Sequence, residues 1–243
     1  MFKPAREVLC DNGVISVRPD SQTPRPPGSG SPLLLVPERS AVIVVDVQRA
    51  FTELPPFAAM REIVPRIARF LPFARVAGMT VVHLLTVFSH KMENAGRLGS
   101  RTRQMMLGLG SEDENPLLQD RPTAEIVPEL SPHPDDVIVT KTRFSGFWGT
   151  NLHEALRSRN IESLIFAGGT TTVCVESTLR DAMFLEFNSL VLSDCTADIT
   201  RELHESALLR MDLFFGWVCG SEDLIPLLEL EPARKEGVEA PSR

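Results

Sequence analysis

The run AVIVV at residues 41–45 is the feature that most constrains the fold of this chain. It is apolar without alternation and mostly β-branched, which is typical of a strand buried on both faces of a parallel sheet. Similar runs recur along the chain and alternate with segments of helical periodicity. Parallel strands then need right-handed crossovers. We therefore expect an α/β fold of three layers, with a doubly wound, mostly parallel six-stranded sheet and helices on both faces.

These runs place the expected elements. Strands are predicted at residues 41–45, 80–87, 137–140, 163–167 and 189–193, with a last one near 214–219. Helices are predicted near residues 58–77, 150–158, 173–187 and 200–211. Residues 95–130 form a long irregular segment, for which two roles are open, a lid over a ligand site or a contact with another subunit.

The N-terminal part has a different composition. Residues 21–32 (SQTPRPPGSGSP) are rich in proline, glycine and serine, as in an extended linker. We therefore predict an N-terminal arm and linker over residues 1–32, outside the core, and one domain over residues 33–243. The arm carries apolar residues that need burial. It packs either on a neighbouring subunit or loosely on its own.

Three chemically active residues follow predicted strands. Asp46 comes directly after the first strand, Lys141 follows the VIV run at 137–139, and Cys174 lies in GGTTTVCVESTLRDA, after the strand at 163–167 and at the start of a helix. Ligands of open α/β sheets bind beyond the carboxyl ends of the strands. We therefore expect an acid, a base and a thiol to meet in one crevice.

The combination suits nucleophilic catalysis. An ammonium beside the sulfur and the positive end of a helix both favour the thiolate, and a carboxylate can take the thiol proton and return it to a leaving amine. Each residue also has an ordinary structural explanation. Cys174 alone would be an inert core thiol, Asp46 a helix N-cap and Lys141 a solvated side chain.

The chain resembles the isochorismatase-like, or cysteine hydrolase, superfamily. The resemblance is carried by VVDVQRAF (44–51), KTRFSGFWGTNL (141–152) and AGGTTTVCVESTLRDA (167–182), and it covers about residues 37–224. Within the superfamily the chain is most similar to ureidoacrylate amidohydrolases, with biuret hydrolases and N-carbamoylsarcosine amidohydrolases nearby. The resemblance implies a hydrolase acting on carbon–nitrogen bonds other than peptide bonds.

The resemblance also implies roles for individual residues. Asp46 would be the general base and acid, Lys141 the cationic partner and Cys174 the attacking thiolate, through a thioester and with release of ammonia or an amine. A cis peptide is expected at Gly169–Thr170. It would aim the N–H of Thr170, together with that of Cys174, at the oxyanion.

Several further residues are candidates for the substrate site and its support. Arg143 is a candidate fork for a substrate carboxylate or carbonyl, although a solvated or ion-paired arginine is the alternative. The candidate substrate-binding residues are Phe51, Phe88, Arg143, Phe147 and Trp148. We expect Gln48, Gly169 and Glu176 to support the catalytic residues from behind.

We predict neither a catalytic metal nor a cofactor. Nicotinamidases, another branch of the superfamily, hold zinc with an aspartate and histidines after the second strand. Here His83 lies within the predicted strand and His90 stands alone, so a set of three ligands is not visible. His83 is interpreted as a hydrogen-bonded strand residue and His90 as a loop residue.

Composition limits the classes of molecule that this protein is expected to bind. The net charge of −7 gives no basic footprint for nucleic acid or anionic membranes. Apolar runs are too short for a membrane span, and four widely spaced cysteines without a CxxC pair do not indicate a disulfide framework. We expect a cytoplasmic protein that acts on a small amide or ureide and, as its resemblance implies, forms a homodimer or homotetramer.

Two other functions stay open at this point. Some isochorismatase-like domains serve as interaction modules, and the run PLLELEPARKEG near the C-terminus could dock a partner. Others hydrolyse the vinyl ether of isochorismate without a cysteine nucleophile. The joint presence of Asp46, Lys141 and Cys174 favours amidohydrolysis over both.

Overall fold

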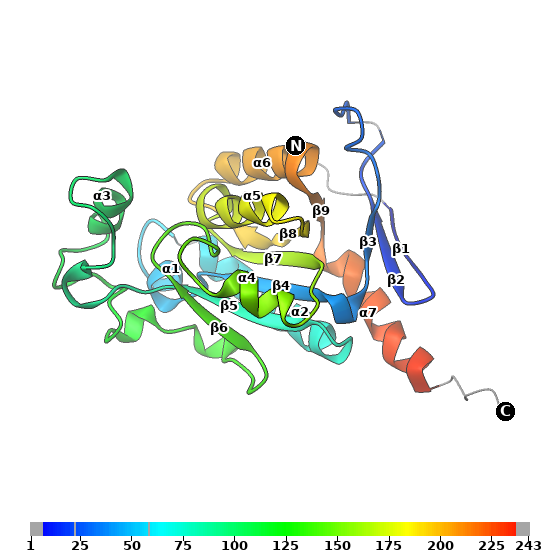
Figure 1. Ribbon diagram of the computed structural model, residues 1–243, viewed down its shortest axis with the longest axis horizontal. Helices are drawn as coiled ribbons and strands as arrows, with labels where there is room; N and C mark the ends of the chain where they lie inside the picture. The colour runs from blue at the N-terminus through cyan, green and yellow to red at the C-terminus, as the bar shows by residue number, and fades with distance from the viewer. Residues whose placement is uncertain (1–6, 22, 58, 237–243) are drawn as a thin grey trace.

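The computed structural model describes residues 7–21, 23–57 and 59–236. Its centre is a six-stranded parallel sheet in the order β6-β5-β4-β7-β8-β9 (Figure 1). Its strands are β4 (Ser40–Val45), β5 (Thr80–Thr86), β6 (Val137–Lys141), β7 (Ser163–Gly169), β8 (Asn188–Ala197) and β9 (Trp217–Cys219). The expected doubly wound parallel sheet of six strands is confirmed.

Strand β4 shows why the sheet carries helices on both faces. All six of its residues are buried. Val42 and Val44 pack into one core, whereas Ala41, Ile43 and Val45 pack into the other. Successive side chains of a strand point to opposite faces, so an uninterrupted apolar run needs cover on each side.

The long helices provide that cover. On one face lie α2 (Ala59–Val76) and α7 (Ser221–Glu236), and on the other lie α4 (Leu152–Arg157), α5 (Glu176–Phe184) and α6 (Arg201–Arg210). Helix α5 is preceded by a π-helical turn, η5 (Thr171–Val175), and α6 is followed by another, η6 (Met211–Phe215). The four predicted helices are all present, with ends that differ by a few residues.

The N-terminal residues form a second sheet that the sequence did not reveal. Strands β1 (Glu7–Asp11), β2 (Val14–Arg18) and β3 (Leu33–Leu35) pair antiparallel, and they lie beside α7 (Figure 1). Ile15 and Val17 are fully buried in the core that also holds α2. The described part of the expected arm is therefore packed tightly on its own domain, because alternation along β2 gives it an apolar face to bury. Residues 1–6 of the arm lie outside the described residues.

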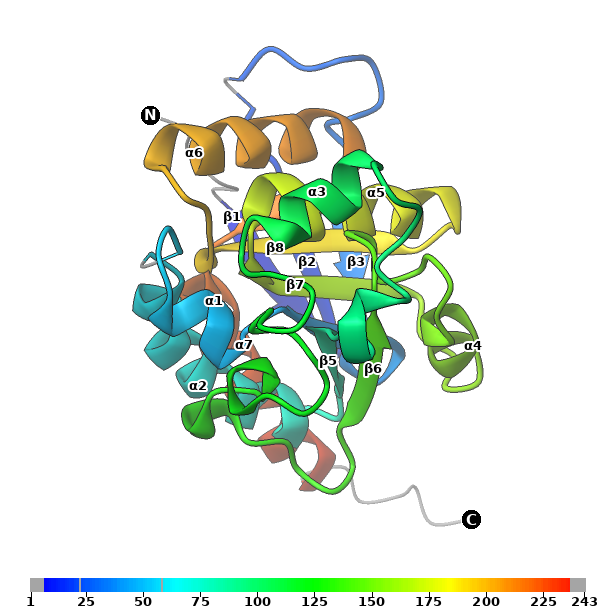
Figure 2. The ribbon, with the colours of Figure 1, turned by 90° about the vertical axis from the view of Figure 1, so that its left-hand side faces the viewer.

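Residues 95–130 are less irregular than expected. They contain α3 (Arg101–Leu107) and two 3₁₀ turns, η3 (Pro122–Ala124) and η4 (Pro128–Leu130). Three other short elements complete the fold: η1 (Pro37–Arg39), α1 (Arg49–Glu53) and η2 (His90–Met92). Figure 1 shows α3 set apart from the sheet, and Figure 2 views the molecule from the side of α3 and α1. Within the described part of the chain, no helix combines the length and apolar character that a membrane span requires.

Candidate active site

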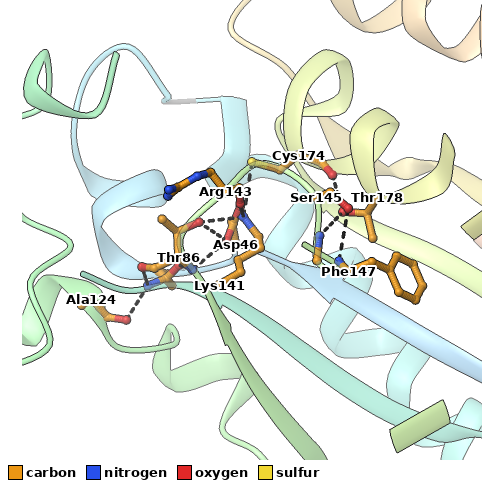
Figure 3. A network of polar contacts seen from close by, with 11 residues as sticks. Asp46, Thr86, Ala124, Lys141, Arg143, Ser145, Phe147, Cys174 and Thr178 are labelled. Carbon is orange, nitrogen blue, oxygen red and sulfur yellow. Dashed lines mark hydrogen bonds and ion pairs between the residues drawn. The ribbon is translucent and has the colours of Figure 1, made fainter. Parts of the chain in front are cut away.

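The three predicted catalytic residues meet at the carboxyl edge of the sheet (Figure 3). Asp46 follows β4, Lys141 is the last residue of β6, and Cys174 lies in the turn η5 that follows β7. The Lys141 ammonium donates to Asp46 Oδ2 at 2.7 Å and lies 3.5 Å from Cys174 Sγ. One ammonium group therefore contacts both the carboxylate and the thiol.

Thr86, the last residue of β5, is a fourth member of this network. Its hydroxyl donates to Asp46 Oδ1 at 2.9 Å and lies 2.7 Å from Lys141 Nζ. Its backbone N–H also donates to Asp46 Oδ1, at 2.9 Å. The hydroxyl and the backbone N–H of Thr86 thus bind one oxygen of the Asp46 carboxylate, and Lys141 binds the other. Sequence reasoning missed Thr86, although its place at the end of the neighbouring strand is the signal that identified Asp46.

Gln48 connects the carboxyl ends of β4 and β5 through buried hydrogen bonds. Its amide oxygen accepts from the N–H of Thr86 at 2.9 Å, and its amide nitrogen donates to the carbonyls of Thr86 and Ala124 at 3.0 and 2.6 Å. The side chain is completely buried. Gln48 thus links the ends of β4 and β5 to the segment that contains η3.

Burial dominates the electrostatics of the thiol. Cys174 is 9% exposed, and this desolvation raises the pKa of its thiol well above the ordinary value, against the opposing effect of the Lys141 ammonium. Burial also opposes the charge of Lys141, but Asp46 and Cys174 together raise the pKa of its ammonium. The expectation of a stabilised resting thiolate therefore needs correction. Burial therefore favours the neutral thiol of Cys174 over its thiolate.

The turn η5, which contains Cys174, is held by polar side chains at both ends. The Asp198 carboxylate accepts from the backbone N–H and the hydroxyl of Thr172, at 2.6 and 2.7 Å. The Thr178 hydroxyl donates to the carbonyl of Cys174 at 2.6 Å. Asp198 and Thr178 were not expected from the sequence, because the strand before Asp198 was predicted to end at residue 193 and a threonine within a helix is ordinary. The peptide Gly169–Thr170 is cis, as the resemblance implied.

A cavity of about 110 Å³ opens onto Cys174. Phe51, Phe88 and Arg143 line it together with Thr170, which places three of the five candidate substrate-binding residues there. Its outer wall comes from Thr102, Met105, Met106 and Leu109, in and just after α3. The segment 95–130 thus contributes directly to the site, as a lid would.

The other two aromatic candidates lie elsewhere. Phe147 stacks on Phe187, with ring centroids 6.0 Å apart, and packs into the core beside α4 and α5. Trp148 is 66% exposed. Neither lines the cavity. The loop after Lys141 turns away from the pocket once it has passed Phe144, because Gly146 is tied to Thr178 by a hydrogen bond of 3.0 Å.

Glu176 supports the helix that follows the nucleophile. Its carboxylate accepts from Arg180 and Arg210, at 2.6 and 2.7 Å. Burial favours the neutral acid, but these guanidinium groups outweigh it and lower the pKa of Glu176. The contact joins α5 to α6 and does not reach the sulfur of Cys174.

The two histidines near the second strand do not meet. His83 is buried, with its Nε2 3.2 Å from Asp136 Oδ2, whereas His90 begins the turn η2. Among the described residues, no three histidine, cysteine or acidic side chains are grouped in a way that could hold a metal ion.

The fold and the site identify the class of the protein. A model of the isochorismatase domain matches residues 40–223, which is most of the chain. The chain therefore belongs to the isochorismatase family.

Two curated relatives are similar over nearly their whole length. The ureidoacrylate amidohydrolase RutB of Rhizobium rhizogenes is 35% identical over 84% of this chain and 89% of the relative. The RutB of Agrobacterium fabrum is 34% identical over 81% and 93%. Among solved structures, a cysteine hydrolase from Pseudomonas syringae pv. phaseolicola superposes with a TM-score of 0.73 and 29% identity, over 86% of this chain and 99% of that one.

Proposed function

We propose that this protein is a cysteine-dependent amidohydrolase. It cleaves a carbon–nitrogen bond other than a peptide bond in a small ureido, carbamoyl or amide compound. The observation that carries the proposal is the buried contact of Lys141 with both Asp46 and Cys174, at the floor of a small cavity. The names of the two RutB relatives support the same bond type.

The first half of the reaction forms a thioester. As Cys174 Sγ attacks the substrate carbonyl carbon, its proton passes to the Asp46 carboxylate, so no free thiolate has to persist in the buried site. The carbonyl oxygen takes up the negative charge, and we assign its stabilisation to the backbone N–H groups of Thr170 and Cys174. Lys141 offsets the charge that develops on sulfur. When the carbon–nitrogen bond breaks, the leaving nitrogen takes the proton from Asp46 and departs as ammonia or an amine.

The second half uses water. Asp46, again a carboxylate, removes a proton from a water molecule as its oxygen attacks the thioester carbon. The carbon–sulfur bond then breaks, and the thiol regains the proton held by Asp46. The product leaves as an acid, and all groups return to their starting protonation states. Thr86 and Gln48 hold Asp46 in place through both halves.

Ammonia release tests the proposal. Purified protein is assayed with 3-ureidoacrylate, biuret, an N-carbamoyl amino acid and a primary amide, beside Cys174→Ala. We expect at least one compound to be hydrolysed and its kcat to fall by roughly 1,000-fold or more in the variant. Cys10→Ala, a change on β1, is the matched control and should keep full activity. Activity that survives in Cys174→Ala would reject the assignment.

Trapping adds a second readout. Mass spectrometry of quenched reactions should find the acyl group on the peptide that contains Cys174. Circular dichroism of Cys174→Ala should match that of the unmodified protein, because the change removes only one sulfur atom.

A further inference from the structure

The charge balance of the cavity indicates what kind of substrate it accepts. Three ionisable residues apart from the thiol bear on it: Asp46, Lys141 and Arg143. The Asp46 carboxylate and the Lys141 ammonium neutralise each other at 2.7 Å, and both are almost fully buried. Arg143 therefore leaves the empty cavity with one uncompensated positive charge.

Arg143 is only partly satisfied by the protein. Its Nη1 donates to the carbonyl of Thr142 at 2.7 Å and to the carbonyl of Asn94 at 3.2 Å. Within the described residues, Nη2 and Nε make no hydrogen bond and no carboxylate forms an ion pair with the guanidinium. The Lys141 ammonium donates to the Arg143 carbonyl at 3.3 Å, and this hydrogen bond connects the backbone of Arg143 to the proposed catalytic residues.

Other buried or half-buried arginines are paired with acids. Arg25 pairs with Asp212, Arg75 with Asp136 and Arg103 with Glu112. Figure 3 shows the Arg143 guanidinium extending on the same side of the network as Thr86, away from Thr178. A guanidinium with two free N–H directions is a fork that matches the two oxygens of a carboxylate.

The walls between the charged groups are apolar. Phe88 and Phe51 stand on the side of the sheet, and Met105, Met106 and Leu109 stand on the side of α3. Low polarity strengthens a charge-assisted hydrogen bond and suits a short hydrocarbon segment. Methionine side chains also adapt to planar or bent segments.

We infer that Arg143 determines specificity by binding a carboxylate of the substrate. The substrate class is a small ureido or amide compound whose scissile carbonyl reaches Cys174 and whose other end, beyond a short hydrocarbon spacer, is an anionic carboxylate. This inference rests on the proposed function, because it assigns the second end of the same substrate.

Kinetics with paired compounds test the inference. 3-Ureidoacrylate and 3-ureidopropanoate carry the carboxylate, and n-butylurea is the neutral counterpart. Arg143→Met should lower kcat/KM for the carboxylates by roughly 10- to 100-fold, mainly through KM, and leave n-butylurea unchanged. For the carboxylates, kcat/KM of Arg143→Lys should lie between the values of the unmodified protein and Arg143→Met, since lysine keeps the charge and loses the fork. Arg101 is an exposed arginine on α3, and Arg101→Met is the control. It should leave kcat/KM unchanged for the carboxylates and for n-butylurea.

Two kinetic outcomes overturn the inference. Equal losses for charged and neutral compounds would mean that Arg143 only supports the fold of the site. Unchanged kcat/KM for the carboxylates would mean that it does not contact them.

Binding separates this inference from the proposed function. Calorimetry with Cys174→Ala should show tighter binding of 3-ureidopropanoate than of n-butylurea, and the difference should vanish in the double variant with Arg143→Met. If no compound is hydrolysed, the proposed function fails, and these affinities still decide the role of Arg143. Equal affinity for both compounds, or no binding of either, overturns it.

Discussion

At the scale of single residues, the site is a balance between burial and charge around one sulfur atom. Desolvation raises the pKa of the Cys174 thiol, and Lys141 acts against it from 3.5 Å. Because Lys141 also neutralises Asp46, its charge is shared between two groups. In the proposed reaction, Cys174 is therefore activated by proton transfer to Asp46 during attack, and less by a thiolate that exists beforehand.

Substitution of Asp198 should show whether this residue positions Cys174 for the reaction or only stabilises the fold. It accepts two hydrogen bonds from Thr172, two residues before the nucleophile, and its other oxygen accepts from the N–H of Ile199. In Asp198→Asn an amide N–H₂ replaces one acceptor oxygen, so at least one of these donors loses its partner. We expect kcat to fall by about 10- to 100-fold with KM within about threefold, which is a barrier increase of about 1.4–2.7 kcal/mol.

Steady-state kinetics and thermal unfolding check this prediction together. Asp120→Asn, at an exposed acid, serves as the control and should leave kcat as it is. If Asp198→Asn lowered thermal stability while kcat stayed constant, Asp198 would support the fold alone.

The three proposed catalytic residues stand out in the sequence for a physical reason. Asp46 and Lys141 are charged residues directly after apolar strands, and such residues are conspicuous against their surroundings. Thr86 belongs to the same edge but could not be singled out, because a threonine at a strand end is common. Asp198 was missed because the strand before it was predicted to end at residue 193, whereas β8 runs to Ala197. Phe147 was wrongly assigned to the cavity, because the direction of the loop decides whether a ring enters a pocket or a core, and the sequence does not show that direction.

At the scale of elements, the passage from β7 into η5 is built on very close backbone approach. Gly168 has φ 101°, in the region that side chains avoid, and a Cβ atom there would lie 2.1 Å from the carbonyl oxygen of Val45. The carboxyl ends of β4 and β7 can therefore bring Asp46 and Cys174 together only with a glycine at this position.

Gly168→Ala should accordingly be severely destabilising. The clash involves backbone that cannot rotate away, so we expect a loss of more than about 3 kcal/mol in the free energy of unfolding, or a Tm lowered by about 6–12 °C. Gly149→Ala, with φ 65° and open space around its Cβ position, should cost only about 1–2 kcal/mol from backbone strain. Differential scanning calorimetry of both variants decides the matter. Similar losses in the two would show that steric contact with Val45 is unimportant.

Several of the elements that sequence reasoning missed are short, although the 16-residue helix α7 was missed as well. Strand β3 has three residues and α1 has five, which is too short for a periodic pattern to stand out. Helix α3 has seven residues inside a polar segment, and its apolar side chains serve the cavity instead of the main cores. The inner strands of the central sheet, β4, β5, β7 and β8, were found because burial on both faces leaves a continuous apolar signature.

At the scale of the whole molecule, buried histidines couple stability to pH. His83 lies 3.2 Å from Asp136, which also pairs with Arg75, and His204 bonds to the Thr171 hydroxyl at 2.9 Å. Burial lowers the pKa of both histidines below their ordinary value of 6.5. The folded protein therefore keeps them neutral at pH values where the unfolded chain binds protons.

The free energy of unfolding should fall as pH decreases below about 6.5. A histidine with a depressed folded pKa contributes stability above its unfolded pKa and loses it on acidification, by at most about 1.4 kcal/mol per pH unit for each group. Urea unfolding between pH 7.5 and 5 measures this slope. His83→Gln should make the slope shallower, and a stability that stayed constant down to pH 5 in the unmodified protein would contradict the prediction.

The N-terminal sheet has a consequence for how the chain is made. Ile15 and Val17 of β2 share one core with Leu224 and Leu228 of α7, and some 200 residues separate these elements. At a synthesis rate of about 5–20 residues per second, β1 and β2 leave the ribosome roughly 10–40 s before the helix that covers them. During that interval the hairpin has an apolar face without its final cover. A ribosome-associated chaperone would find a binding segment there, and one that disappears only when α7 arrives.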